Sequence, residues 1–367
     1  MKTPAEILRG SLKEHTVDAR RIMQAAKNPA CAVSRTAMLA GVDMEEMATR
    51  AFGQALESHL SPFAIRQGNV FEHWITENGA TRLVDALVKN GILGPTETRV
   101  RHLGDNRDLR SRNDAIRRAA IRHAIAETDR ELKRKFEGRP DAFNVLLQAH
   151  IPIRLADDGV VAVLRADALI APEVAPAYMI GEIKSFAALH HNTDTNDVQS
   201  AAAQAGVYAV GLEERMRYLG LAADVPKKGV LILKSVGSLN AAPSMQPIER
   251  DIDFARRMLA QRPRTLAEVS AILGPGEGLD KAANILKLPR NFMGSCRSFC
   301  PMAKVCQNLA VAEGHPASVS NNLADLIGHM NTVRALELLA GAQAANREEA
   351  EVQQRLLDAH GALQKAG

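Results

Sequence analysis

The spacing of hydrophobic residues changes along the chain, and the changes predict its elements. Residues 3 to 28 have helical spacing, which stops at the Asn28-Pro29 pair. A second helical region runs to about residue 91, and a basic segment over 99 to 140 predicts a further helix. Acidic residues are interspersed in that segment, so a solvated helix with ion pairs is favoured slightly over a DNA-binding track.

The spacing becomes strand-like at residue 141. Turns at Asp157-Asp158-Gly159 and near Val174 separate three short runs rich in Val, Ile and Leu. A helix over Asp194 to Tyr218 and a buried strand over Gly229 to Val236 are expected after them. The order strand, strand, strand, helix, strand predicts an α/β fold with a mixed sheet covered by helices. The three runs, expected to form an antiparallel meander, are His150 to Leu155, Val160 to Ile170 and Tyr178 to Phe186.

The last part of the chain returns to helical spacing. This pattern predicts a helical hairpin, and it fits equally a docking surface for a partner. Periodicity does not separate the two. The apolar face is formed by Leu323, Ile327, Met330, Val333, Leu336 and Leu339, and is continued by Val352 and Leu356.

These patterns divide the chain into four parts. Residues 1–140 are expected to form a helical N-terminal region and 141–290 a core around the sheet. A cysteine-bearing segment covers 291–314, and a helical extension covers 315–367.

Composition narrows the class of protein. With 46% hydrophobic and 24% charged residues, the 367-residue chain is typical of a globular protein, which argues against wholesale disorder. A net charge of +4 is compatible with a polyanionic partner but does not require one. The N-terminus lacks the apolar core of a signal peptide, and no stretch reaches membrane-spanning length. We therefore expect a cytoplasmic protein without membrane contact.

Three charged residues interrupt the apolar runs of the predicted meander. Asp167 lies in LRADALI, and Glu182 and Lys184 lie in GEIKSF. In an antiparallel hairpin Asp167 is expected opposite Glu182, on the face shared by Lys184. Two facing carboxylates repel each other and need a cation between them, and their oxygen atoms favour Mg²⁺ or Mn²⁺. Such a metal lowers the pKa of a bound water and polarises a phosphate, so the group suits phosphodiester hydrolysis.

All four cysteines of the chain can belong to one site. Cys296, Cys300 and Cys306 lie within GSCRSFCPMAKVCQN, and Cys31 lies far upstream. In a reducing compartment they are better interpreted as metal ligands than as disulfides. A set of four cysteines suits Zn²⁺ or an iron–sulfur cluster, and the spacing alone leaves that choice open.

LRADALI, GEIKSF and the later QAGVY resemble the motifs of the RecB-type branch of the PD-(D/E)xK nucleases. That branch includes the CRISPR-associated iron–sulfur exonucleases and the nuclease subunits of helicase–nuclease complexes. The resemblance implies a restriction-endonuclease-like α/β core, whose mixed sheet is flanked by helices, with helical N- and C-terminal parts joined by a metal cluster. It further implies a Mg²⁺- or Mn²⁺-dependent deoxyribonuclease, more in keeping with an exonuclease than an endonuclease, acting on DNA in repair, processing or phage defence.

The resemblance also assigns roles around the acidic hairpin. It implies that His73, in QGNVFEH, joins Asp167 and Glu182 as a metal ligand, with the carbonyl of Ile183 as a further ligand. Gln204 and Tyr208, four residues apart and so on one helical face, are expected to contact the substrate.

The resemblance implies a [4Fe–4S] cluster on Cys31, Cys296, Cys300 and Cys306. This chain has three residues between Cys296 and Cys300, where the family usually has two. Two other interpretations stay open. One is an iron–sulfur DNA-binding or assembly subunit with an idle nuclease site, and the other is a zinc-stapled scaffold without nucleic-acid function. No GxxxxGK[ST] phosphate loop is present, so any ATP-driven unwinding must come from a partner. The resemblance implies that this partner is a helicase or another defence or repair protein, bound through the C-terminal helices.

Overall fold

The chain is described by a computed structural model that forms two compact units. The sheet unit comprises Thr16–Ala26 and Leu60–Pro263, and the cysteine unit comprises Met1–His15, Lys27–His59 and Arg264–Gly367. The turns predicted at Asp157-Asp158-Gly159 and Val174 lie outside the described residues, as do the expected element ends Leu155, Val160 and Asp194. The described residues are 2–15, 17–53, 62–96, 99–111, 113–154, 161–172, 175–188, 195–222, 224–260, 262–292, 296, 300–316 and 321–366.

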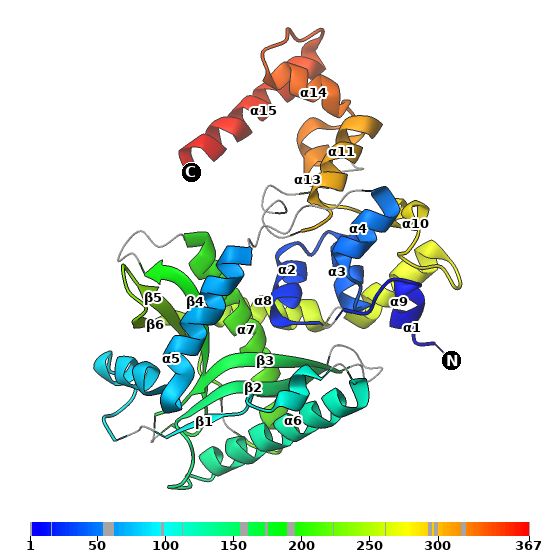
Figure 1. Ribbon diagram of the computed structural model, residues 1–367. Coiled ribbons are helices and arrows are strands. Elements are labelled where there is room, and N and C mark those ends of the chain that lie inside the picture. The colour runs from blue at the N-terminus through cyan, green and yellow to red at the C-terminus, as the bar shows by residue number, and fades with distance from the viewer. Residues whose placement is uncertain are drawn as a thin grey trace. The chain divides into compact units, whose positions relative to one another are not determined.

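The sheet unit is α/β, as predicted, and contains a six-stranded mixed sheet in the order β1-β2-β3-β4-β5-β6 (Figure 1). The pairs β1–β2 and β4–β5 are parallel and the other three are antiparallel, which confirms the predicted meander as β2, β3 and β4. β1 and β6 were not predicted, because one is only three residues long and the other is poor in β-branched residues. The strands are β1 (Val100–His102), β2 (Val145–Arg154), β3 (Val161–Ile170), β4 (Met179–Ala188), β5 (Lys228–Ser235) and β6 (Ala241–Pro247).

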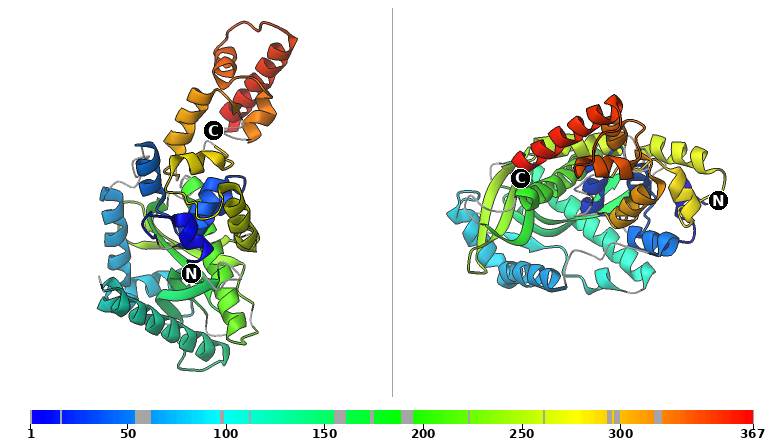
Figure 2. Two further views of the ribbon diagram at one scale, coloured as in Figure 1. Left: turned by 90° about the vertical axis from the view of Figure 1, so that its right-hand side faces the viewer. Right: turned by 90° about the horizontal axis from the view of Figure 1, so that it is seen from above.

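Helices flank the sheet, with α5 and α7 on opposite sides (Figure 2). Phe71, Ile75, Leu83 and Leu87 of α5 are fully buried in a core cluster that also contains residues of β2 to β5. These positions recur at helical spacing, so burial of one apolar stripe fixes which way α5 is turned. The helices of this unit are α5 (Pro62–Lys89), α6 (Asp114–Phe136), α7 (Thr195–Tyr218), α8 (Glu249–Ala260) and most of α2 (Ala19–Lys27).

Trp74 lies outside the buried apolar stripe of α5. It is 37% exposed, and the guanidinium of Arg82 lies 3.7 Å from the centre of its ring. α5 also breaks internally, because Asn78, Gly79 and Ala80 all have positive φ. Asn and Gly tolerate that conformation best, which places the break at the Asn-Gly pair.

The prediction of one helix over residues 3 to 28 is wrong. The segment contains α1 (Pro4–Arg9) and α2, and the described residues between them, 10–15 and 17–18, are not helical. Gly10 ends α1 with φ of +63°, and its N–H bonds back to the carbonyls of Glu6 and Ile7. A Cβ at Gly10 would lie 2.5 Å from Asp280, so the tight turn depends on a residue far away in the sequence.

The remaining helices belong mainly to the cysteine unit. The predicted hairpin face is confirmed for six of its eight residues, which contribute to one apolar cluster: Leu323, Ile327, Met330, Leu339, Val352 and Leu356. The prediction is wrong for Val333 and Leu336, which are 43% and 57% exposed. No helix in the described parts of the chain is long and apolar enough to cross a membrane. The helices are α3 (Ala32–Leu39), α4 (Met44–Phe52), α9 (Arg262–Leu273), α10 (Ala282–Lys287), α11 (Ala303–Glu313), α13 (Asn321–Ile327), α14 (Thr332–Leu339) and α15 (Arg347–Ala366).

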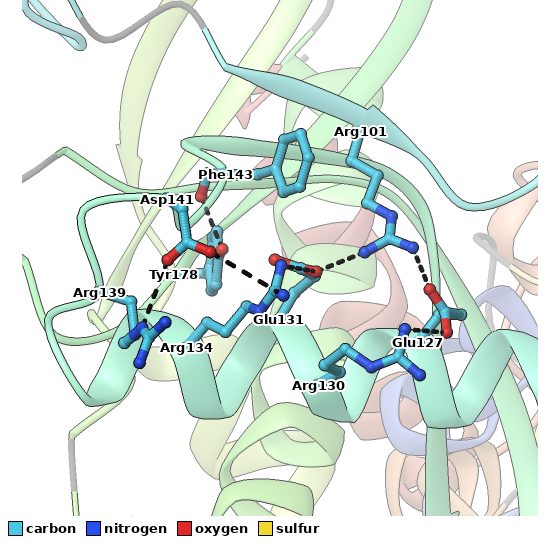
Figure 3. Close-up of polar contacts among 9 residues, drawn as sticks. All are labelled: Arg101, Glu127, Arg130, Glu131, Arg134, Arg139, Asp141, Phe143 and Tyr178. Atoms are coloured by element: carbon cyan, nitrogen blue, oxygen red, sulfur yellow. Dashed lines mark hydrogen bonds and ion pairs between the residues drawn. The ribbon is translucent and has the colours of Figure 1, made fainter.

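The basic segment over 99 to 140 is β1, a short 3-10 helix (Arg107–Arg110) and α6, and an ion-pair network joins β1 to α6 (Figure 3). Arg101 of β1 donates to Glu127 and Glu131 of α6, which are 7% and 0% exposed. Arg130 and Arg134 also pair with these carboxylates. The predicted ion pairs are therefore present, but their acidic partners are buried.

We expect Arg101→Leu to lower the free energy of unfolding by about 1.5–3 kcal/mol, because it removes a cation that bonds to both buried carboxylates and leaves each of them with an arginine of α6 alone. Urea unfolding of the purified protein measures this loss. The control is Arg139→Ala, since Arg139 pairs with Asp141 on the exposed surface, and this change should have little effect. Equal stability of the two variants would contradict a stabilising role for the network.

Candidate active site and cysteine site

The structure brings Asp167, Glu182 and Lys184 together. The β3–β4 ladder ends at the pair Ala168 and Gly181, so Asp167 and Glu182 occupy the next positions on the two strands. Beyond that pair, the Asp167 carboxylate accepts a hydrogen bond from the backbone N–H of Ile183 at 3.0 Å. The Lys184 ammonium lies 2.5 Å from Glu182 Oε1. The two acids and the lysine thus meet as the alternation of the hairpin predicts.

Burial makes this group electrostatically unusual. Glu182 is 1% exposed, and its Oε2 atom has no hydrogen-bond partner in the described structure. Burial and the nearby Asp167 raise the pKa of Glu182 to about 8, and burial also raises the pKa of Asp167. Burial alone would lower the pKa of Lys184, but the charges of Glu182 and Asp167 raise it. Two carboxylates with one ammonium leave an excess negative charge that a cation would relieve.

A third carboxylate, Glu72 of α5, faces this group and was missed in the sequence. The charge of Glu72 contributes to raising the pKa values of both Glu182 and Lys184. α5 approaches β4 closely at Gly68, where a Cβ would lie 3.7 Å from Ser185 Oγ. Glu72 is one helical turn after Gly68 and lies on the same face of α5. The Gly-x-x-x-Glu spacing in the sequence could therefore have indicated that Glu72 faces the sheet.

Gln148 holds the Glu72 side chain. Its amide Nε2 donates to Glu72 Oε1. Gln148 has φ of +56° in the middle of β2, where the pairing with β3 skips from Leu147 to Ala149. Left-handed backbone at a residue other than glycine is strained and tends to occur at functional sites.

His73 does not join Asp167 and Glu182, contrary to the expectation from the resemblance. Its side chain is 79% exposed, and its Nε2 atom lies 3.6 Å from Glu77 Oε2. Phe71 and Ile75 are turned into the core, which leaves His73 on the solvent side of α5. The Ile183 side chain is buried in that core, and its N–H is used by Asp167.

Gln204 and Tyr208 of α7 both reach the acidic group. Gln204 Oε1 accepts a hydrogen bond from Lys184 Nζ at 3.3 Å. Tyr208 is only 8% exposed; burial, with the charges of Glu182 and Asp167, raises the pKa of its hydroxyl. The predicted shared face of the QAGVY helix is therefore present, with Gln204 orienting the lysine.

The four cysteines gather in the cysteine unit. Cys31, Cys296, Cys300 and Cys306 are buried, none of the four is in a disulfide, and all of them line one cavity of about 10 Å³. Burial and the other cysteines raise the pKa of Cys300, and they raise that of Cys306 to about 12, although Arg290 opposes this. Thiols that hinder each other's ionisation in this way suit a shared cation.

Two asparagines support the cysteine site. Asn28 Nδ2 lies 3.5 Å from Cys296 Sγ and donates to the Asn291 carbonyl at 2.6 Å. Asn291 Nδ2 donates in return to Asn28 Oδ1 at 2.9 Å. This pair ties the segment before Cys31 to the segment before Cys296. Hydrogen bonds to ligand sulfur atoms are a usual feature of thiolate metal sites.

Neither group has the geometry of a bound ion as it stands. Among the described residues, no three His, Cys, Asp or Glu side chains are close enough together to hold a metal ion. The chain matches no protein-family model, no curated protein and no solved structure.

Proposed function

We propose that the protein is a Mg²⁺- or Mn²⁺-dependent deoxyribonuclease whose sheet unit is a PD-(D/E)xK-type core. The observation that carries the proposal is that Asp167 and Lys184 meet the buried Glu182 carboxylate where the β3–β4 ladder ends. Two carboxylates whose pKa values are raised by burial, with Asp167 raising that of Glu182 further, favour a bound cation, and a lysine held beside them favours an anionic substrate such as phosphate.

The donor chemistry of these residues, carboxylate oxygens beside one another, suits a hard divalent metal ion. Asp167 and Glu182 would hold it, and Glu182 Oε2 is a buried oxygen without a hydrogen-bond partner in the described structure. Glu72 would complete the acidic set in the place expected for His73. When bound, the metal supplies Lewis-acid polarisation of the phosphate and lowers the pKa of an attacking water.

Lys184 would stabilise the negative charge that develops on the phosphate during hydrolysis. Its ammonium is positioned by Glu182 on one side and by Gln204 on the other. A positioned cation of this kind is most effective in a site from which water is excluded. Tyr208, buried behind the acids, would keep that part of the site dry.

The four cysteines would hold a [4Fe–4S] cluster in the cysteine unit. They fit a metal centre because four buried thiols line one cavity, with the Asn28 amide at Cys296 and the positive charge of Arg290 near Cys306. Zn²⁺ is the alternative occupant. The cluster would act as a structural staple, because metal binding stabilises only the folded state.

The direct test is a cleavage assay on the full-length, cluster-loaded protein purified without oxygen. End-labelled single- and double-stranded DNA should be degraded with Mg²⁺ or Mn²⁺, not with EDTA, and not by Asp167→Asn. Linear DNA should be degraded and closed circular DNA spared if the enzyme is an exonuclease. A wild-type protein that cuts no DNA with any divalent metal would refute the proposal and favour an iron–sulfur binding or assembly subunit with an idle site.

We expect Glu72→Gln to reduce cleavage by about 10- to 100-fold, as is usual when a residue supporting a metal site is removed. His73→Ala should leave the rate unchanged, because its side chain is exposed. Initial rates over a Mg²⁺ titration measure both variants, and a higher metal requirement in Glu72→Gln would identify the defect. If His73→Ala cleaved DNA more slowly than Glu72→Gln, then His73 and not Glu72 would be the metal ligand.

A further inference from the structure

The first half of α6 and the segment before it contain a dense group of arginines. Residues 107–123 include six arginines and two aspartates, which give a net charge of +4 with His123 neutral. The 46 basic and 42 acidic residues of the whole chain also give +4, so the rest of the chain is neutral in sum. The excess positive charge of the protein therefore lies in one stretch of the sheet unit, and such a concentration of charge suits a polyanionic partner.

The two halves of α6 differ in how their arginines are used. In the second half, Arg130 and Arg134 pair with buried carboxylates. In the first half, Arg118 and Arg122 are exposed, and neither forms an ion pair with another described residue. These two arginines are four residues apart, so they share one helical face on which like charges repel each other. An external anion would relieve that repulsion.

Small side chains accompany these arginines on the exposed side of α6. Ala115 and Ala119 are exposed, whereas Ala120 and Ala124 are buried on the packed side. The guanidinium groups are therefore the outermost groups of this surface. Residues 107–123 contain no Phe, Tyr or Trp, and an unpaired base would need such a ring to stack on. The surface offers contacts to phosphates rather than to bases.

α6 runs antiparallel to β2 along the outer side of the sheet unit (Figure 1). Glu131 bonds to Arg101, and Arg101 pairs across the strands with Leu146. Thr128 Oγ1 accepts a hydrogen bond from the His150 N–H at 3.2 Å. Residues of α6 before Thr128 therefore lie alongside the part of β2 that follows His150.

This direction fixes the distance between the exposed arginines and the candidate active site. His150 pairs with Arg165 of β3, which is two residues before Asp167. Two strand residues, followed by the six to ten helical residues that separate Thr128 from the two arginines, span about 15–20 Å along the strands. In a duplex that length corresponds to about five or six base pairs.

We propose that the first half of α6 binds the backbone of duplex DNA, with Arg118 and Arg122 contacting phosphates about five or six base pairs from the cleavage site. This inference rests on the proposed nuclease function and names the form of its substrate. A duplex presents phosphates on its outside and keeps its base faces inside, so it matches a surface of arginines and alanines. A single strand also exposes bases, which this surface has no aromatic ring to hold.

The test measures DNA binding by full-length, cluster-loaded protein made inactive by Asp167→Asn. The probe is a fluorescein-labelled blunt duplex of about 20 base pairs, followed by fluorescence anisotropy at several salt concentrations. Arg118→Gln and Arg122→Gln should each lower the salt slope by about 0.9, the value for one phosphate contact on B-form DNA. Arg118→Glu and Arg122→Glu should each weaken binding about tenfold or more.

The matched controls are Lys89→Gln at the end of α5 and Lys228→Gln at the start of β5. Each removes one positive charge from an exposed position elsewhere in the sheet unit. Both should bind the duplex as the parent does, and all four glutamine variants should melt at the parent temperature. Equal losses of affinity in the controls would show that only the total charge matters, which would overturn the assignment to α6.

Two further measurements separate the outcomes. Binding of single-stranded dT20 should be weakened less than binding of the duplex, and an equal loss would overturn the duplex assignment. In the active background, KM for the duplex should rise more than kcat falls, because these arginines lie away from the acidic group. If the wild type cuts DNA but both arginine variants bind and cut like the controls, the α6 inference fails alone. If the wild type cuts nothing and the binding losses persist, only the nuclease proposal fails.

Discussion

Glu182→Gln is expected to lower the rate of DNA cleavage by about 10³-fold or more, and Lys184→Met by about 10²- to 10³-fold. Glutamine keeps the shape of Glu182 but removes the negative charge that would hold the metal. Methionine keeps the length of Lys184 but removes the charge that would stabilise the phosphate. Single-turnover cleavage of end-labelled DNA measures both effects independently of product release.

Thermal unfolding with and without metal provides a readout that does not depend on cleavage. Mg²⁺ or Mn²⁺ should raise the melting temperature of the wild type, because the ion binds the folded state alone. It should not raise that of Glu182→Gln. Without metal, Glu182→Gln should be about as stable as the wild type near pH 7, because a pKa of about 8 keeps Glu182 mostly protonated and glutamine resembles the neutral acid. A Glu182→Gln variant that still cuts DNA at the wild-type rate would exclude Glu182 from the chemistry.

The acidic hairpin could be predicted because its geometry is local. A strand has a side-chain period of two, so a short connection between antiparallel strands fixes which residues face each other. The ladder from Ile170–Met179 to Ala168–Gly181 is the register that puts Asp167 and Glu182 at the next positions. The apolar runs around them were enough to identify both strands.

Glu72 could not be chosen over His73 in the same way. The two are neighbours on α5, and either can face the sheet depending on how the helix is turned. That turn is set by burial of Phe71 and Ile75 and by the close approach at Gly68, which are contacts with distant strands. The resemblance implied a histidine, but the packing of α5 turns Glu72 toward the sheet and His73 toward solvent.

Long-range contacts also explain the other differences. Glu127 and Glu131 look solvent-facing in a basic segment, yet they are buried because Arg101 reaches them from β1. The break after α1 depends on Gly10 and on Asp280, which lies in the last third of the chain. Helical spacing contains no information about either partner.

Cys300→Ser should remove the bound metal from the cysteine unit and lower its stability by several kcal/mol. A structural metal held by cysteines contributes its binding free energy to folding, which is about 10–16 kcal/mol for zinc in small peptides. Removing one ligand removes a large part of that stabilisation. Cys300 is also 9% exposed at the centre of the set, with its N–H bonded to the Cys296 carbonyl at 2.8 Å. Elemental analysis, visible absorption and urea unfolding measure the two effects.

The matched control is Ser34→Ala, which changes a buried residue lining the same cavity without touching a sulfur. It should keep the full metal content, so a loss of metal only in Cys300→Ser would assign the ligand. Iron and sulfide in the wild type would support the cluster, whereas zinc alone would keep the four-cysteine site and replace its occupant. If the wild type carries neither metal and Cys300→Ser unfolds like Ser34→Ala, the four thiols are a packed apolar group. The raised pKa values of Cys300 and Cys306 would then reflect neutral thiols in the core.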